Sequence, residues 1–336
     1  MSRKLITIST IMTLMSTSVM ADVPNVAADI APIHSLVSKV MDGVCEPKLV
    51  IQSGASPHGY RLRPSEAKAL QDANLIFWMG EELTPWLEGA IDTLASNASV
   101  TALLDQDGIV LHDFRQGALF EAHDHDDHDD HDDHDDHDDH KDHDDHDDHD
   151  GHDDHDDHDD HDDHGHGAHD PHAWLSPENA KLWLNIIASK LSVADPENAA
   201  SYFTNDAVGQ VEIEDMVAEV SATLKPVQGG KFVVFHDAYQ YFENDFDFYA
   251  SGAISLSDAS DPSPARIARI QKRIRDEGIQ CVLAEPQFKQ GLVATVMEGS
   301  EATASVIDPL GADIKPGPML YTQLIKNMAK KIKDCL

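Results

Sequence analysis

Apolar and polar positions follow two repeating patterns along most of this chain. Short apolar runs bounded by turn residues indicate strands, and segments whose apolar residues recur every three or four positions indicate helices. In the first half, the pattern predicts strands at 23–30, 48–52 and 74–79, and helices at 32–41 and from residues 65 and 83. In the second half, it predicts strands at 231–235, 248–254, 279–284 and 303–307, and helices at 237–245, 264–276, 289–298 and 319–334.

Two longer helical patterns lie between these halves. Residues 176–191 predict an amphipathic helix, with Ser176 as its N-cap and Pro177 at the first helical position. Residues 197–224 predict a helix of about 28 residues, which would span roughly 40 Å at ~1.5 Å per residue. A helix of this length suits a rigid connector between two lobes.

The order of the elements predicts the fold class. Strands that alternate with helices favour parallel sheets covered by helices, and such sheets bind ligands at the carboxyl ends of their strands. About 265 ordered residues are too many for one small core. We therefore expect an α/β fold with two lobes, each a mostly parallel sheet flanked by helices. The first lobe would cover 22–194, a connecting helix 195–225 and the second lobe 226–336.

The first 21 residues are typical of a secretory signal peptide. Arg3 and Lys4 precede an apolar stretch at 5–15, and small and polar residues then lead to Ala21. The apolar run is shorter than the ~20 residues that a membrane-spanning helix needs, and no cysteine follows the cleavage point. We expect a mature chain that begins at Asp22, is soluble in the periplasm and does not insert into the membrane.

Residues 121–170 break the pattern of strands and helices. They hold 17 of the 22 histidines and 26 aspartates, mostly as Asp-Asp-His triplets. A segment without apolar side chains buries no core, so we expect it to be disordered until something binds it. A solvated acidic linker is the simpler interpretation, but it leaves the histidines unexplained. Because imidazole and carboxylate both bind divalent metals, we interpret this His/Asp tract as a metal-binding loop with many weak sites.

Charge narrows the classes of partner. The chain carries 62 acidic and 24 basic residues, a net charge of −38, of which the His/Asp tract contributes −26 and the rest −12. Neither part attracts nucleic acid or an anionic membrane surface.

The three cysteines (Cys45, Cys281 and Cys335) allow three pairings. We favour Cys281–Cys335, because it would join the end of a C-terminal helix to a strand, and we then expect Cys45 to be a buried, free thiol.

Three histidines outside the tract occupy unusual positions. His58 lies in a loop between a strand and a helix, His172 directly precedes a helix, and His236 follows the apolar run 232–235 at its carboxyl end. Each alone is more often a capping or core-edge residue than a ligand. Together, in a chain with a metal-binding tract, they predict a shared metal site.

The segments around these histidines resemble a known family. The motifs at 57–65, 172–177, 235–239 and 284–288, in this order, are similar to those of the metal-binding solute-binding proteins of ABC importers, above all the periplasmic zinc-uptake branch. The resemblance covers essentially the whole mature chain. It implies that zinc is the transported ligand and binds in the cleft between the lobes. His58 and His172 would come from the first lobe and His236 from the second. It also implies a disulfide like Cys281–Cys335.

One position departs from the family pattern. Zinc members often have a glutamate directly before the first histidine, and here that residue is Pro57. The fourth ligand is therefore either Asp308, which follows a strand where related proteins supply an aspartate, or water. The alternative role for Asp308 is that of a turn-forming residue before Pro309. Glu285 either orients a ligand through a hydrogen bond or forms an ion pair at the surface.

These observations predict a monomeric binding protein that delivers Zn(II) to a membrane permease and is not an enzyme. A zinc hydrolase is disfavoured, because the sequence has no HExxH-type helix and no nucleophile elbow. Two alternatives stay open: a periplasmic zinc buffer or metallochaperone, and a manganese- or iron-binding member of the same family. Manganese prefers more oxygen ligands than three imidazoles provide.

Overall fold

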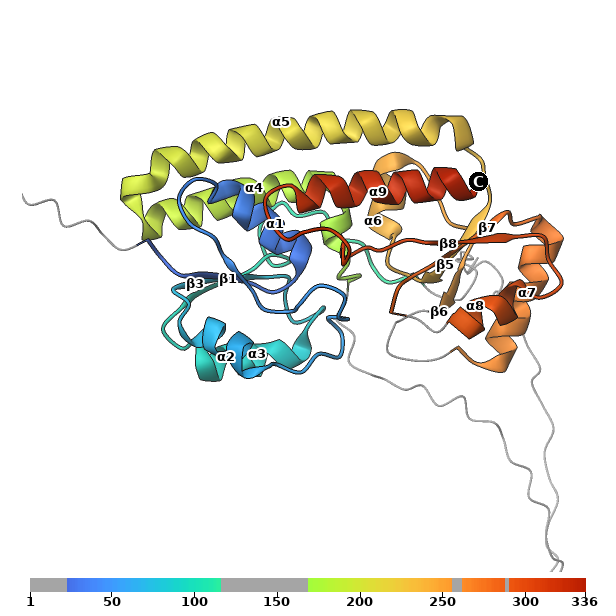
Figure 1. The fold of residues 1–336 in the computed structure, drawn as a ribbon, viewed down its shortest axis with the longest axis horizontal. Helices are drawn as coiled ribbons and strands as arrows, with labels where there is room; N and C mark the ends of the chain where they lie inside the picture. Colours follow the sequence, from blue (N-terminus) through green and yellow to red (C-terminus); the bar gives the residue numbers. More distant parts are fainter. Residues whose placement is uncertain (1–22, 116–168, 256–261, 288–289) are drawn as a thin grey trace, which may run out of the picture.

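The computed structural model describes residues 23–115, 169–255, 262–287 and 290–336 (Figure 1). The predicted signal peptide lies outside these residues, and so does the His/Asp tract apart from its last two positions. Among the described residues, no helix is both long and apolar enough to cross a membrane.

Each half of the chain contains a four-stranded parallel sheet. The first has the order β2-β1-β3-β4 and the second the order β6-β5-β7-β8. The strands are β1 (Val26–Ala28), β2 (Lys48–Leu49), β3 (Leu75–Trp78), β4 (Ser99–Ala102), β5 (Phe232–His236), β6 (Ala253–Ser255), β7 (Cys281–Ala284) and β8 (Thr303–Val306). The expected fold class is confirmed, since both sheets are parallel and flanked by helices.

The helices cover the sheets and join the lobes. They are α1 (Ala31–Val40), α2 (Pro64–Gln71), α3 (Pro85–Leu94), α4 (Pro177–Ala194), α5 (Ala199–Leu224), α6 (Gln240–Phe246), α7 (Pro264–Glu277), α8 (Gln290–Met297) and α9 (Leu320–Cys335). Ser176 caps α4 as expected, because its Oγ accepts the Asn179 backbone N–H at 3.3 Å.

The central strands are apolar on both faces because helices cover both sides of each sheet. In β5, Phe232 and Val234 pack into an apolar cluster that continues into the first lobe. Val233 and Phe235 point to the other face and join a smaller cluster with Ile270 of α7. His236 follows at the carboxyl end of this buried strand, so its position is fixed by the core.

Two long helices bridge the halves of the molecule. Helix α5 has 26 residues and extends over both lobes, with α9 beside it (Figure 1). Helix α9 contacts α5 and also α1 of the first lobe, where Ser35 donates to Gly317 O at 2.7 Å and accepts the Tyr321 N–H at 2.9 Å. The domain boundaries at 195 and 225 stay a prediction. Helix α9, which belongs to the predicted second lobe, contacts both lobes.

The disulfide Cys281–Cys335 fastens the end of α9 to the first residue of β7, as expected. Cys45 is free but exposed, so the expectation that it is buried was wrong. It follows the last turn after α1, where the chain leaves the core, and its Sγ lies 4.0 Å from the Glu46 carbonyl oxygen.

Candidate metal centre

Three histidines from three separate segments meet between the lobes. His58 lies in the loop between β2 and α2, His172 lies directly before a 3₁₀ turn that leads into α4, and His236 is the last residue of β5. One ring nitrogen of each lies within 4.8 Å of the other two, and this is the one such group of histidine, cysteine or carboxylate side chains within the described ranges. The arrangement is the one that the sequence predicts.

The second ring nitrogen of two histidines is held by a buried carboxylate. His236 Nδ1 lies 2.5 Å from Glu285 Oε1, and His172 Nδ1 lies 2.6 Å from Asp170 Oδ1. A carboxylate accepts, so these contacts place the proton on Nδ1 and direct the Nε2 lone pair of each ring away from it. The two Nε2 atoms are only 3.4 Å apart. Two metal-ligating lone pairs therefore point into one small space.

Both carboxylates are inaccessible to solvent. Glu285 is 3% exposed, and its second oxygen accepts Gln287 Nε2 at 2.7 Å. Asp170 is 1% exposed, and burial raises its pKa to about 6, opposed by the hydrogen bond from the His172 backbone N–H. Of the two interpretations of Glu285, the hydrogen bond to a histidine is confirmed. Asp170 as the partner of His172 was not expected.

The third histidine is more exposed than the other two. His58 is half-buried, whereas His172 and His236 are 5% and 3% exposed. Its loop is fixed from both sides, because Trp86 Nε1 donates to Pro57 O at 2.7 Å and the His58 N–H donates to Ser56 Oγ at 3.3 Å. Tyr60, two residues later, donates to the buried Glu66 of α2 at 2.8 Å.

Asp308 lies just after β8, but its carboxylate is engaged with its own loop. Oδ1 accepts the N–H groups of Leu310 and Gly311 at 2.9 and 3.1 Å, and Oδ2 accepts that of Ala312 at 2.5 Å. It is not part of the three-histidine group. Its role as the fourth ligand stays a prediction, with water as the other candidate.

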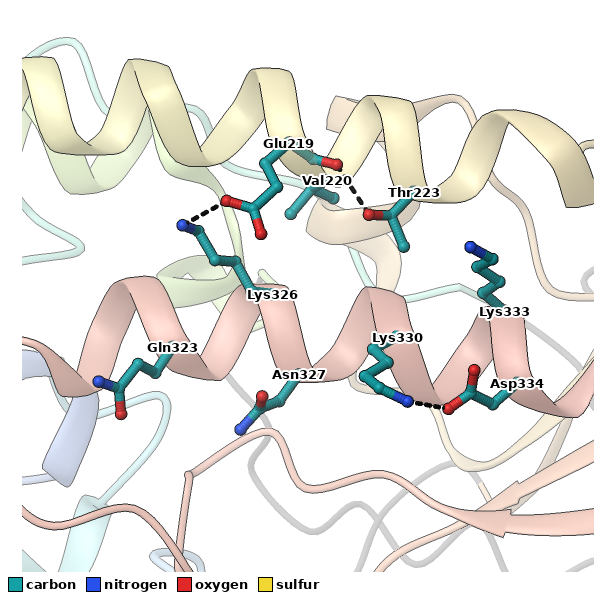
Figure 2. Close-up of a pocket in the computed structure, with 9 residues that line it drawn as sticks. All are labelled: Glu219, Val220, Thr223, Gln323, Lys326, Asn327, Lys330, Lys333 and Asp334. Carbon is teal, nitrogen blue, oxygen red and sulfur yellow. Dashed lines mark hydrogen bonds and ion pairs between the residues drawn. The ribbon is translucent and has the colours of Figure 1, made fainter.

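A groove elsewhere on the molecule shares no residue with the histidine group. It lies between α5 and α9, with a volume of about 430 Å³ (Figure 2). Four of the five charged side chains that line it form ion pairs: Lys326 Nζ lies 2.6 Å from Glu219, and Lys330 pairs with Asp334. The groove contains none of the clustered metal-binding side chains, so the candidate site is the histidine group.

Comparisons with known proteins identify the family of this chain. The model of the ZnuA family, described as "Zinc-uptake complex component A periplasmic", matches residues 26–335. The high-affinity zinc uptake system protein ZnuA of Brucella abortus (strain 2308) is 50% identical over 311 residues, covering 93% of this chain and 91% of that protein. Its counterpart in Paracoccus denitrificans is 47% identical over 317 residues, with 94% and 93% covered.

Solved structures share the fold. A crystal structure of ZnuA superposes with a TM-score of 0.69 at 21% identity, covering 94% of this chain and 99% of that one. A manganese complex of the solute-binding protein FpvC from Pseudomonas aeruginosa reaches a TM-score of 0.68 at 16% identity, with 93% and 97% covered. The fold is thus common to proteins described with different metals. The match over nearly the whole chain and the identity of its relatives show that this chain belongs to the ZnuA family.

Proposed function

We propose that this protein is the periplasmic substrate-binding component of a zinc ABC importer, which captures Zn(II) and delivers it to the membrane permease. The observation that carries the proposal is the convergence of three imidazoles, two of which have Nδ1 on a buried carboxylate and Nε2 facing the shared space. The zinc-uptake relatives support the same conclusion.

The donor set favours zinc over manganese or iron. Zinc prefers four ligands in a tetrahedron and accepts imidazole readily, whereas manganese prefers oxygen. Here His58, His172 and His236 would bind the ion, and Asp308 or water would complete the tetrahedron. A site with three neutral imidazoles neutralises little of the ion's charge, and this suits an ion that must later be released.

The His/Asp tract would bind additional zinc weakly. Its many interchangeable histidines and aspartates define no single ligand set, so we expect each ion to bind there with low affinity. A high local density of ligands still speeds capture beside the tight site. This part of the proposal rests on the sequence alone, since the tract lies outside the described residues but for its last two positions.

Growth in controlled zinc tests the proposed role. A strain that lacks this protein should grow poorly when zinc is limiting and recover when zinc is added, because an uptake component is needed only at scarcity. The His236→Ala variant should fail to restore growth, while the wild-type gene should restore it. A buffer or metallochaperone would instead be needed mainly at excess zinc, and this result would contradict transport.

A further inference from the structure

Arg115, from the first half of the chain, forms ion pairs with two buried carboxylates of the second lobe. Its Nε donates to Asp237 Oδ1 and Oδ2 at 3.0 and 3.1 Å, and its Nη1 donates to Glu243 Oε2 at 2.6 Å. The Arg115 side chain is 16% exposed, and the side chains of Asp237 and Glu243 are 5% and 1% exposed. Buried acids at this depth need a charged partner, since unpaired buried charge is strongly unfavourable.

One of these acids is adjacent to a candidate zinc ligand. Asp237 directly follows His236 at the end of β5, and Glu243 lies on α6, the next helix. The planar guanidinium of Arg115 reaches both carboxylates at once, which lysine could not reproduce with the same geometry. Arg115 therefore fixes the turn between β5, whose last residue is His236, and α6.

The segment of Arg115 is also connected to the second candidate ligand. Asp113 forms an antiparallel bridge with His169, and the Asp170 N–H donates to His112 O at 2.8 Å. Tyr241 of α6 ties the two strands of this bridge to the second lobe, because its hydroxyl donates to Asp170 O at 2.7 Å and accepts the His112 N–H at 3.1 Å. Asp170 is the carboxylate that holds His172.

We propose that Arg115 is a positioning residue for zinc binding. It acts on His236 through Asp237, and on His172 through the paired segments 112–115 and 169–170, so that ligands from opposite lobes keep their spacing. The inference rests on the proposed zinc site and names a residue outside the ligand set on which that site depends. Without Arg115, two buried carboxylates lose their cation, the β5–α6 turn relaxes, and the imidazoles no longer meet at one point.

The experiment compares Arg115→Met with Arg273→Met in the full mature chain. Arg273 is a matched control: its side chain is 19% exposed and pairs with Glu277 at 2.6 Å within α7. Zinc affinity is measured by competition with a chelator, zinc release by stopped flow, and the melting temperature of the metal-free protein by calorimetry. Arg115→Met should weaken zinc binding and speed release by roughly tenfold, in line with loss of preorganisation, while Arg273→Met should leave both unchanged.

A second variant separates positioning from general stability. Adding Glu243→Gln to Arg115→Met removes one of the two unpaired charges, so part of the lost zinc affinity should return. Should Arg115→Met fail to fold, Arg115→Lys keeps the charge without the fork and should still weaken binding about threefold. The proposal is overturned if these variants lower the melting temperature yet bind and release zinc like the wild type. If His236→Ala also kept tight binding, the zinc site itself would be wrong, and the two failures are thus distinguishable.

Discussion

The candidate ligands differ in burial and in the kind of element that carries them. In His172 and His236 a buried carboxylate accepts from Nδ1, which fixes the tautomer and the direction of Nε2. His58, on a loop, is half-buried. In the proposed site each ring contributes one of three protein ligands, and within the described residues no other histidine, cysteine or carboxylate belongs to the group.

Replacing His58, His172 or His236 singly with alanine should lower zinc affinity by orders of magnitude. The lost imidazole leaves an ion with too few protein ligands, and water is a weaker substitute. Chelator-competition titration of each variant measures the change, and His34→Ala is a control because His34 contacts Pro47 O and Ser38 instead. Wild-type affinity in all three variants would contradict the site.

Glu285→Gln should weaken zinc binding by about 10- to 100-fold, the usual effect of losing a carboxylate that orients a histidine ligand. Glutamine keeps the size of the side chain but not the charge that favours the Nδ1–H tautomer of His236. The same titration checks it, and circular dichroism tests that the fold is kept. An affinity equal to that of His236→Ala would mean that Glu285 does more than orient the ring.

Asp308→Asn should weaken zinc binding only modestly. Its carboxylate already accepts three backbone N–H groups of its own loop, and water can fill the fourth vertex of the ion. We expect the larger effect on the melting temperature of the metal-free protein, because asparagine has one oxygen acceptor where aspartate has two. A loss of zinc affinity as large as that of His58→Ala would refute this ranking.

At the scale of elements, the disulfide and the histidine group lie at opposite ends of the second sheet. Cys281 begins β7, whereas Glu285 follows its end. Replacing Cys281 and Cys335 with serine should therefore cost about 2–4 kcal/mol in the free energy of unfolding, through a less constrained unfolded chain. Zinc affinity should stay within about twofold of the wild type. Urea unfolding and zinc titration measure the two effects, and a large loss of affinity would show that the bond also shapes the site.

Most elements could be predicted from sequence because their burial is strong and regular. Strands β3, β5 and β7 are buried at every residue, and each appeared as an apolar run. Strand β4 was missed, because Ser99 and Val100 are exposed and the segment lacks a continuous apolar run. Helix α6 begins at Gln240 and not at 237, and Asp237, which precedes it, is engaged by Arg115.

The candidate site was predictable to a similar extent. Histidines that follow strands or precede helices meet at one edge of an α/β fold, so their convergence could be expected. Glu285 follows β7, the neighbour of β5, and its contact with His236 agrees with parallel pairing. Asp170 had no such signal, because it is one of 26 aspartates in the His/Asp tract. The available clue was its position two residues before His172, because an aspartate at that spacing can accept the backbone N–H, as Asp170 does in the structure.

At the scale of the whole molecule, charge is unevenly distributed, with −26 of the net −38 in the His/Asp tract. Deleting residues 123–164 should leave one tightly bound zinc ion and remove several weakly bound ones. The weak ions should dissociate as pH falls toward about 6, since metal binding needs neutral imidazole. Equilibrium dialysis of both forms gives the stoichiometry. Loss of the tightly bound zinc ion, or an unchanged number of bound zinc ions, would contradict this division between one tight site and several weak sites.

The position of α9 has a consequence for how the chain is made. Every residue of α1 is buried, and its neighbours include α4, α5 and α9, of which α9 is the last element synthesised. During synthesis the N-terminal part of the chain emerges first, so α1 appears early. It is fully enclosed only after residues 320–335, which form α9, have emerged. The native bond from Cys281 to Cys335 is likewise delayed until Cys335 emerges. Vectorial folding thus completes the first lobe only after α9 has emerged, so the apolar side chains of α1 are open to aggregation until α9 docks.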